Sequence, residues 1–172
     1  FPAEAMESDM NKRAASVPIL YDRMTPKDGE TILTIEQAAY SSPWTRRMFE
    51  SELWENPFSF AYVAREEEHR RIGGYVLFWI VYDELHLMNV AVEPGWRRRG
   101  VGEGLVRFAL ENGRRRGIRM ATLEVRGSNL PAQSLYRNLG FYQVGIRRNY
   151  YREPREDALL LQCDFGGGGE EG

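Results

Sequence analysis

The chain has 172 residues, of which 42% are hydrophobic and 12% aromatic, and its formal net charge at pH 7 is −2. That length suits one domain with its own hydrophobic core, and the composition excludes a largely disordered protein. Because the net charge is close to zero, no overall field draws the chain to nucleic acid or to an anionic membrane, and we expect neither as a direct partner.

Two terminal segments are expected to lie outside the domain. Residues 1–16 are polar and are predicted to form a flexible arm, and the tail at 166–172 is too rich in glycine to pack. Residues 17–165 then form a single domain. The longest apolar run, residues 75–82, is too short to span a bilayer, and the first segment holds no apolar stretch of signal-peptide type. We therefore expect a cytoplasmic protein.

The first part of the chain is predicted to form one strand and two helices. VPILYDRM at 17–24 has strand character, and the segment 25–40 carries apolar residues at helical spacing. Thr45 is expected to cap a second helix over 45–54, which the Asn-Pro pair at 56–57 ends.

Three successive strands follow in the sequence. They are predicted over residues 58–65, 72–82 and 84–92. Short turns at 66–71 and around Asp83 connect them, so the sheet is expected to begin antiparallel.

The second half of the chain alternates helices and strands. Helices are predicted over 101–117 and 130–140, and strands over 118–126, 141–151 and 157–165. The resulting order is β-α-α-β-β-β-α-β-α-β-β, so the predicted fold class is α/β with one mixed sheet.

The turn EPGWRRRGVGEG at 93–104 joins a strand to a helix and is rich in arginine and glycine. A helix N-terminus exposes unpaired N–H groups with about half a positive charge, and glycines let an anion approach them closely. The turn therefore suits a phosphate or pyrophosphate. A nucleotide-triphosphate loop is excluded because Val101 stands where it needs lysine, whereas a dinucleotide fingerprint with imperfect spacing and a solvated basic loop stay open.

Metal-ligating residue types are sparse in the sequence. The single cysteine, Cys163, cannot form an intrachain disulfide, and His69 and His86 lie far apart with no cysteine cluster near them. We expect no metal cofactor.

The pattern Arg97-x-x-Gly100-x-Gly102, after a strand that ends in Val-Glu-Pro, resembles the acetyl-coenzyme A pyrophosphate loop of the GCN5-related N-acetyltransferases (GNAT). LEVRGSN at 123–129, SLYRNLGF at 134–141 and IRRNYY at 146–151 resemble the branch that acetylates the N-terminal alanine of a small-subunit ribosomal protein (the RimI type). The resemblance covers roughly the whole predicted domain. It implies the GNAT fold with a splayed central strand pair, acetyl-CoA as co-substrate and a protein N-terminus as acceptor.

The resemblance also implies which residues bind the coenzyme. In related enzymes the strand before the glycine turn parts from its neighbour and its backbone bonds the pantetheine arm. From the bare sequence that strand end is ordinary core, and Asn129 is either a helix cap or a coenzyme contact. The expected coenzyme residues are Val90, Ala91, Val92, Arg97, Arg98, Arg99, Gly100, Val101, Gly102, Glu103 and Asn129.

Glu124 and Tyr136 are the candidate catalytic residues. Period-two alternation places Glu124 on one strand face with Met120 and Thr122, and we expect partial burial to raise its pKa toward the working pH. The alternative for Glu124 is a salt bridge to a neighbouring arginine such as Arg126. Tyr136 resembles the tyrosine that protonates the leaving thiolate in this family, and its alternative role is core packing.

The acceptor slot is expected to lie between aromatic side chains. By resemblance, Trp44, Tyr150 and Tyr151 flank the peptide. The acceptor stretch is basic in the best-known member of the family, so acidic residues should line the slot, with Glu156 and Asp157 as weak candidates. Arg147 and Arg148 could equally belong to a solvated strand face. The loop YREPRED departs from the family pattern, which leaves acceptor breadth open.

Four functions are consistent with these observations to different degrees. The favoured one is an N-terminal protein acetyltransferase, acting as a monomer or weak dimer. The same fold could acetylate a small amine, which the IRRNYY segment disfavours, or could bind acetyl-CoA without catalysis, which the pair Glu124 and Tyr136 disfavours. An RNA-binding role for the arginine clusters is disfavoured by the near-neutral charge.

Overall fold

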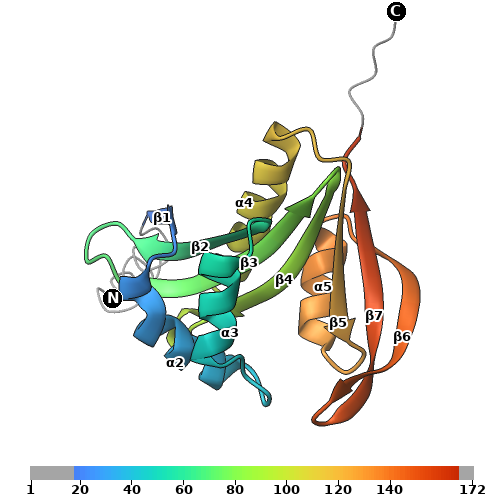
Figure 1. Cartoon of the computed structure of the whole chain (residues 1–172), viewed down its shortest axis with the longest axis horizontal. Coiled ribbons are helices and arrows are strands. Elements are labelled where there is room, and N and C mark those ends of the chain that lie inside the picture. Colours follow the sequence, from blue (N-terminus) through green and yellow to red (C-terminus); the bar gives the residue numbers. More distant parts are fainter. Residues whose placement is uncertain (1–17, 167–172) are drawn as a thin grey trace, which may run out of the picture.

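The computed structural model describes residues 18–166 (Figure 1). The arm predicted at 1–16 and the predicted tail beyond Gly166 lie outside the described residues. Within the described range, none of the helices is both long and apolar enough to cross a membrane.

In this part of the chain, seven strands form one mixed sheet in the order β1-β2-β3-β4-β5-β7-β6. Every neighbouring pair is antiparallel except β4 and β5, which are parallel. The strands are β1 (Ile19–Arg23), β2 (Ser59–Glu66), β3 (Ile72–Val81), β4 (Glu84–Val92), β5 (Met120–Arg126), β6 (Tyr142–Arg152) and β7 (Arg155–Asp164).

Helices cover both faces of the sheet (Figure 1). They are α2 (Gly29–Ala39), α3 (Arg46–Glu50), α4 (Val101–Arg115) and α5 (Leu130–Asn138). Successive residues of β3 point to opposite faces, and Tyr75 and Leu77 pack with residues of α2 and α3, whereas Val76 and Phe78 pack with residues of α4. The sheet is therefore the middle layer between two hydrophobic cores.

The predicted fold class and element order are confirmed. The structure adds 3₁₀ turns at Pro26–Asp28 and Pro94–Trp96, and it replaces the second half of the helix predicted over 45–54 with a π-helical turn at Ser51–Glu55. Thr45 caps α3 as expected, because its hydroxyl accepts a hydrogen bond from the Met48 backbone N–H at 3.2 Å.

The central pair of strands parts early. β4 and β5 pair only from Glu84 opposite Met120 to Leu87 opposite Leu123. The residues of β4 beyond Leu87 stay paired with β3, up to Val92 opposite Gly74, but have no partner in β5. This is the splayed strand pair that the family resemblance implies.

A bulge in β4 lies where the two strands part. Leu77 of β3 faces Asn89 while the next residue, Phe78, faces Leu87, so Met88 is the extra residue. A bulge shifts the alternation of side chains by one position. Leu87 accordingly packs with the α4 side of the sheet, and Asn89 is buried on the α2 side.

Trp96 packs directly over Gly73, which holds the start of the arginine loop against the sheet. A Cβ atom built on Gly73 would lie 2.1 Å from a ring carbon of Trp96. We therefore expect Gly73→Ala to lower the free energy of unfolding by about 1–3 kcal/mol, because the indole must move. Urea unfolding of the variant measures this loss.

The matched control is Gly145→Ala in β6. A Cβ atom there would meet Leu160 at 3.8 Å, an ordinary contact. Its free energy of unfolding should stay within roughly 0.5 kcal/mol of the parent protein. Equal losses in the two variants would contradict the packing argument.

Candidate active site

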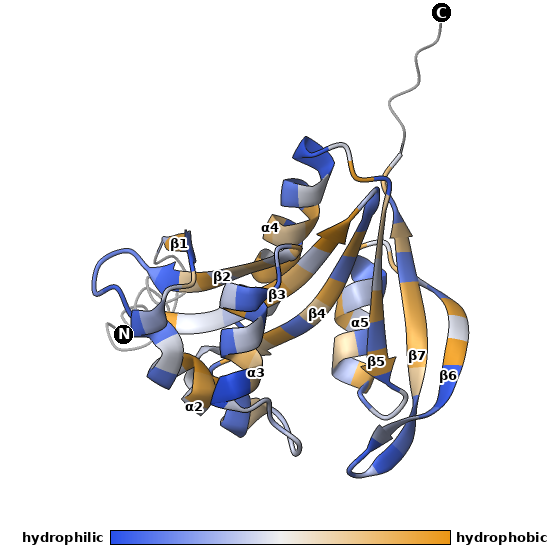
Figure 2. Cartoon of the chain, viewed as in Figure 1, coloured by the Kyte–Doolittle hydropathy of each residue, from blue (hydrophilic) through white to orange (hydrophobic). Residues whose placement is uncertain are grey.

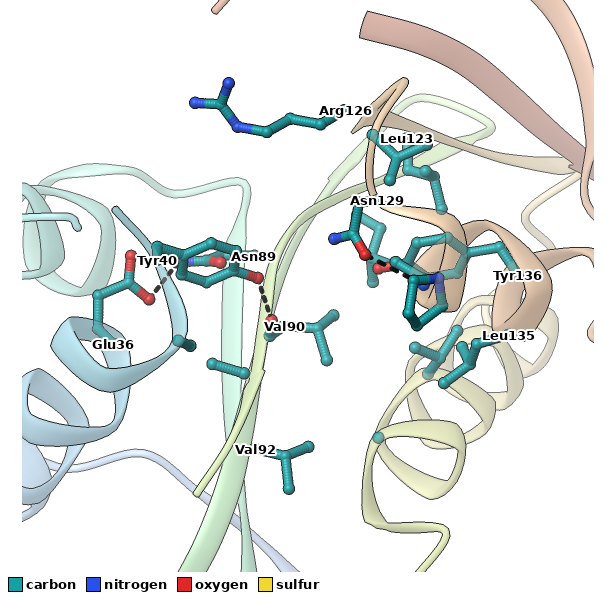
Figure 3. Close-up of a pocket in the computed structure, with 18 of the residues that line it drawn as sticks. Glu36, Tyr40, Asn89, Val90, Val92, Leu123, Arg126, Asn129, Leu135 and Tyr136 are labelled. Carbon is teal, nitrogen blue, oxygen red and sulfur yellow. Dashed lines mark hydrogen bonds between the residues drawn. The ribbon is translucent and has the colours of Figure 1, made fainter. Parts of the chain in front are cut away.

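A cleft of about 1080 Å³ opens where β4 and β5 part (Figure 3). Ligand pockets in proteins are roughly 300–1,000 Å³, so the cleft has room for a large ligand. Its lining comes from α2, the α2–α3 loop, the ends of β4 and β5, the start of α4, α5 and the β6–β7 hairpin. In Figure 3, Glu36, Tyr40 and Asn89 lie to one side of β4, and Asn129, Leu135 and Tyr136 lie across the opening.

One end of the cleft is the N-terminus of α4. Gly100 precedes the helix with a φ of 73°, a left-handed conformation that favours glycine, and no side chain caps the helix there. The backbone N–H groups of Val101, Gly102 and Glu103 are thus free to bind a ligand. Together with the lining residues Arg97 and Arg98, they form a positive site suited to an anion.

The predicted site residues gather around this cleft, with Arg99 as the exception. Arg98 adopts a φ of 64°, and the loop turns so that Arg99 is not among the lining residues. The predicted residues that line the cleft are Trp44, Val90, Ala91, Val92, Arg97, Arg98, Gly100, Val101, Gly102, Glu103, Glu124, Asn129, Tyr136, Tyr150 and Tyr151. Asn129 also caps α5, because its side chain accepts from the Ala132 N–H at 3.2 Å.

Tyr40 is a cleft residue that sequence reasoning missed. It ends α2, and its hydroxyl donates a hydrogen bond to the carbonyl of Val90 on the part of β4 that has no partner in β5 (Figure 3). Burial raises the pKa of Tyr40, so the phenol keeps its proton. Its only sequence signal is an aromatic residue placed directly before the SSPW turn at 41–44.

Glu124 lies in β5 with its side chain 9% exposed and is held by two basic groups. Its carboxylate oxygens lie 2.6 Å from His86 Nε2 and 3.3 Å from Arg147 Nε. Burial alone would raise the pKa of Glu124, but the hydrogen bond and charge of His86 and the charge of Arg147 outweigh it, so its pKa lies below the ordinary value. The expected rise of this pKa is therefore wrong.

The partner of Glu124 also differs from the one suggested by sequence. Arg126 lies two residues along the same strand and instead contacts Glu156 at 3.4 Å and the Tyr151 ring at 4.1 Å. The arginine that reaches Glu124 is Arg147, which comes from β6. Residues two apart in a strand share a face, but this contact depends on how the β6–β7 hairpin bends across the sheet.

Tyr136 packs and lines the cleft at once. Its ring meets Phe141 edge-on with centroids 5.7 Å apart, and it contributes to the core on the α4 side. Burial raises the pKa of Tyr136 to about 12. The hydroxyl is therefore protonated near neutral pH and can act as a donor.

The other end of the cleft lies between the α2–α3 loop and the β6–β7 hairpin. The rings of Tyr150 and Tyr151 meet edge-on at 5.0 Å, and Trp44 lines the opposite side of the opening from the loop. Ser42 Oγ donates to the carbonyl of Glu153 at 3.0 Å, which ties the loop to the hairpin. The looped end of this hairpin is hydrophilic (Figure 2).

The predicted acidic wall is not formed by Glu156 and Asp157. Neither lines the cleft: Glu156 accepts from Ser128 Oγ at 3.0 Å, and Asp157 accepts from the Asn149 N–H at 2.8 Å. The carboxylates that do line the acceptor end include Glu36 and Glu124. Glu153 of the YREPRED loop does line the cleft, whereas Glu156 and Asp157 bond the hairpin and its neighbours instead.

Comparison with known proteins decides the family. Residues 29–141 match the Acetyltransferase (GNAT) family. The chain belongs to this family. GNAT enzymes use acetyl-CoA, so the protein is an acetyl-CoA-dependent N-acyltransferase.

Relatives of this GNAT protein point to one branch. A Bacillus subtilis (strain 168) protein, provisionally named a ribosomal protein bS18-alanine N-acetyltransferase, is 40% identical over 138 residues, which span 80% of this chain and 90% of the relative. The Escherichia coli (strain K12) enzyme of that name is 36% identical over 129 residues, 74% of this chain and 84% of the enzyme. The crystal structure of the ribosomal-protein-S18-alanine N-acetyltransferase from Escherichia coli superposes with a TM-score of 0.80 at 30% identity, covering 90% of this chain and 98% of that one.

The cleft of this GNAT protein fits acetyl-CoA on three counts. The α4 N-terminus offers open amides, Arg97 and Arg98 add positive charge, and the free edge of β4 can bond an extended arm. A Cβ atom on Gly102 would meet Val92 at 3.4 Å and Leu135 at 3.6 Å, so little room exists there for a larger side chain. Among residues 18–166, no group of three or more His, Cys, Asp or Glu side chains is arranged to hold a metal ion.

We expect Gly102→Glu to abolish measurable acetyl-CoA binding while the protein stays folded. The new carboxylate would place a negative charge and a long side chain at the helix N-terminus where we expect the diphosphate to bind. Isothermal titration calorimetry with acetyl-CoA measures the affinity, and circular dichroism checks the fold.

Gly102→Ala is the matched control for this variant. Its methyl group makes near-ordinary contacts with Val92 and Leu135 and adds no charge. Its affinity for acetyl-CoA should fall by less than about tenfold, which corresponds to 1.4 kcal/mol. Unchanged acetyl-CoA binding by the glutamate variant would refute the assignment of this loop.

Proposed function

We propose that this protein transfers the acetyl group of acetyl-CoA to the N-terminal amine of a protein, most specifically the N-terminal alanine of ribosomal protein bS18. The observation that carries the proposal is one continuous cleft, lined by the anion site at α4, by the aromatic acceptor end and by both Glu124 and Tyr136. The names of the relatives with 36–40% identity support the choice of acceptor.

Acetyl-CoA, when bound, supplies a thioester carbonyl that an amine can attack. The backbone amides of Val101, Gly102 and Glu103, together with Arg97 and Arg98, would bind its diphosphate. The backbone of Val90, Ala91 and Val92 would bond the pantetheine arm, with Asn129 as a further contact. These residues hold the donor so that the acceptor amine needs to be positioned only at the far end of the cleft.

Glu124 would take the proton that the amine releases as the new N–C bond forms. A carboxylate with a lowered pKa is a weak base, but it is ionised at every pH near neutrality. A peptide α-amine has a pKa of about 7.7–8.0, so a useful share of it is already neutral at pH 7. Glu124 therefore has to accept a proton only from nitrogen that is becoming positively charged, which needs no raised pKa.

Tyr136 would donate its phenolic hydrogen to the departing sulfur. Its pKa of about 12 lies above the value of about 8.5 for an ordinary thiol. The phenol therefore acts chiefly as a hydrogen-bond donor that stabilises the developing negative charge. Full proton transfer to the sulfur runs uphill between these two pKa values, so it is completed as solvent returns a proton to the phenolate. Replacing Tyr136 with phenylalanine would remove this donor and keep the ring contact with Phe141.

The acceptor class is tested with a panel of amines. We expect acetylation of a peptide that begins with the bS18 N-terminal alanine, detected by mass spectrometry, and no acetylation of the same peptide with a blocked N-terminus. For polyamine and aminoglycoside acceptors, kcat/KM should be lower by about 100-fold or more, because they cannot fill the backbone contacts of a peptide slot.

The blocked peptide is the control for side-chain acetylation, since it keeps any lysine. Comparing the N-termini of ribosomal proteins from cells with and without this protein extends the test to natural substrates. Equal kcat/KM for small amines and the alanine peptide would favour the small-amine alternative. Acetyl-CoA binding without turnover of any amine would favour a non-catalytic binding module.

The pH dependence of turnover tests the role of Glu124. Because its pKa is depressed, the carboxylate is already ionised above its ordinary pKa of 4.5, and it loses its charge only at lower pH. Between pH 5 and 8, kcat/KM should therefore follow the acceptor amine with its pKa of about 7.7–8.0. Glu124→Gln should lower kcat by about 10²–10⁴-fold at every pH in that range, without shifting the pH at which kcat/KM rises as the acceptor amine loses its proton.

Glu84→Gln is the matched control, because Glu84 lies on β4 outside the cleft and accepts a hydrogen bond from Thr122 at 2.7 Å. Its rate profile should match that of the parent protein. A limb near pH 6 that is present in the parent and absent in Glu124→Gln would instead show a raised pKa for this carboxyl group.

A further inference from the structure

Glu36 is a buried carboxylate in the floor of the cleft that the proposed chemistry does not use. It lies on α2, is 1% exposed, and lines the cleft beside Tyr40. Its Oε1 accepts the backbone N–H of Trp44 at 2.9 Å. Its Oε2 accepts from Asn89 Nδ2 at 3.0 Å and from the hydroxyl of Tyr75.

The partners of Glu36 are all neutral donors. Among the ion pairs of residues 18–166, none involves Glu36, whereas Glu124 in the same cleft contacts both His86 and Arg147. Burying a carboxylate without a cation costs free energy, which hydrogen bonds offset only in part. An aliphatic side chain would fill an ordinary core position at lower cost, so the carboxylate at this position needs a reason in its contacts.

Those contacts join three separate parts of the molecule. Trp44 belongs to the α2–α3 loop that borders the acceptor end of the cleft, and the bond from Glu36 fixes the backbone of that loop. Asn89 stands beside the bulge of β4, immediately before Val90, where the strand turns its free edge to the cleft. Tyr75 lies in β3, and its hydroxyl also accepts from Asn89 Nδ2 at 3.1 Å.

The hydrogen-bond polarity of this cluster depends on the carboxylate. Both oxygens of Glu36 act as acceptors for three donors, and an amide side chain at 36 would have only one oxygen to offer. Burial and the neighbouring Glu36 raise the pKa of Tyr75, which keeps its hydroxyl a donor. Buried networks of this kind lose most of their value when one member is left without a partner.

We propose that Glu36 is a positioning residue for acetyl transfer, whose carboxylate fixes the Trp44 loop against β4 and so sets the distance between the acceptor amine and the coenzyme. The same loop reaches the β6–β7 hairpin through Ser42 and the Glu153 carbonyl, so the anchor at Glu36 orients both walls of the acceptor slot. A shift of about 1 Å in such an element can cost 100-fold in rate. This inference rests on the proposed transfer to a protein N-terminus.

The first test is Glu36→Gln. Its kcat/KM for the alanine peptide should fall by about tenfold or more, through misplacement of the acceptor. Its Kd for acetyl-CoA, measured by calorimetry, should change by less than about twofold, because the α4 amides and the β3-paired backbone of β4 do not depend on this carboxylate. If Glu36 only stabilised the fold, Glu36→Gln would weaken the use of the peptide and the binding of acetyl-CoA together.

The matched control is Glu66→Gln. Glu66 is also buried, at 6% exposed, but it pairs with Arg71 at 3.0 Å and does not line the cleft. It should keep the parent kcat/KM for the peptide. If kcat/KM for the peptide fell equally in both variants, the loss would follow from burying an amide at any such position. That result would overturn the proposal.

The exchange of the two polar groups is the sharper test. In the double variant Glu36→Gln with Asn89→Asp, the glutamine amide can donate to the new carboxylate while its oxygen still accepts the Trp44 N–H. Each single variant should have a lower kcat/KM for the peptide than the parent protein. The double variant should have a kcat/KM at least about threefold higher than that of the less active single variant. Additive losses in the double variant would show that the two side chains do not act through their contact.

Amide hydrogen exchange at Trp44 tests the anchor without any acceptor. The exchange rate of this N–H in the folded protein, followed by NMR, should rise about tenfold or more in Glu36→Gln and stay unchanged in Glu66→Gln. If the parent protein acetylates no N-terminus but Trp44 exchange responds in this way, the proposed function fails and the anchor stands. If the parent is active and neither exchange nor kcat/KM responds, the role of Glu36 fails alone.

Discussion

The early end of the β4–β5 pairing is the constraint on which the rest of the site depends. Only the stretch from Glu84 to Leu87 pairs with β5, so the remaining backbone of β4 has one side open. Backbone N–H and C=O groups that lack both a strand partner and water cost free energy, and a ligand that supplies partners is favoured there. In the folded chain one of these groups, the carbonyl of Val90, is already met by Tyr40. The opening thus creates both the space for a ligand and the reason for an extended ligand to bind along the strand.

The bulge at Met88 lets one strand serve both cores on either side of that opening. Without the extra residue, the alternation that buries Leu85 and Leu87 on the α4 side would also turn Asn89 toward that side. With it, Asn89 faces α2 and meets Glu36, while Val92 packs beside α5 and α4. The acceptor loop and the anion site at Gly100–Glu103 are therefore positioned from opposite faces of the same strand.

Local patterns predicted the elements and the uncapped helix start after the glycine turn, because these depend on residues close in sequence. Thr45 caps α3 by accepting a hydrogen bond from a backbone N–H only three residues later in the chain. The alternation in β5 places Leu123 in the core on the α4 side and Glu124 on the other face. The contacts that set the chemistry are of another kind: His86 and Arg147 reach Glu124 from β4 and β6. No spacing rule predicts which of several arginines crosses to a given carboxylate. Nor does any rule predict which two of three consecutive arginines line the cleft, where Arg98 turns the chain with a positive φ.

Two carboxylates in one cleft with opposite surroundings imply a division of roles. Glu124 is balanced by a histidine and an arginine, which keep it ionised and keep its basicity low. Such a group can take a proton and return it to solvent, because both of its partners reach the surface: the Arg147 side chain is 53% exposed and that of His86 is 28% exposed. Glu36 is enclosed by hydrogen-bond donors that water cannot replace unless the loop or the sheet opens. The environment of each carboxylate, more than its distance from the opening, therefore supports the proposed roles: proton transfer for Glu124 and the geometry of the slot for Glu36.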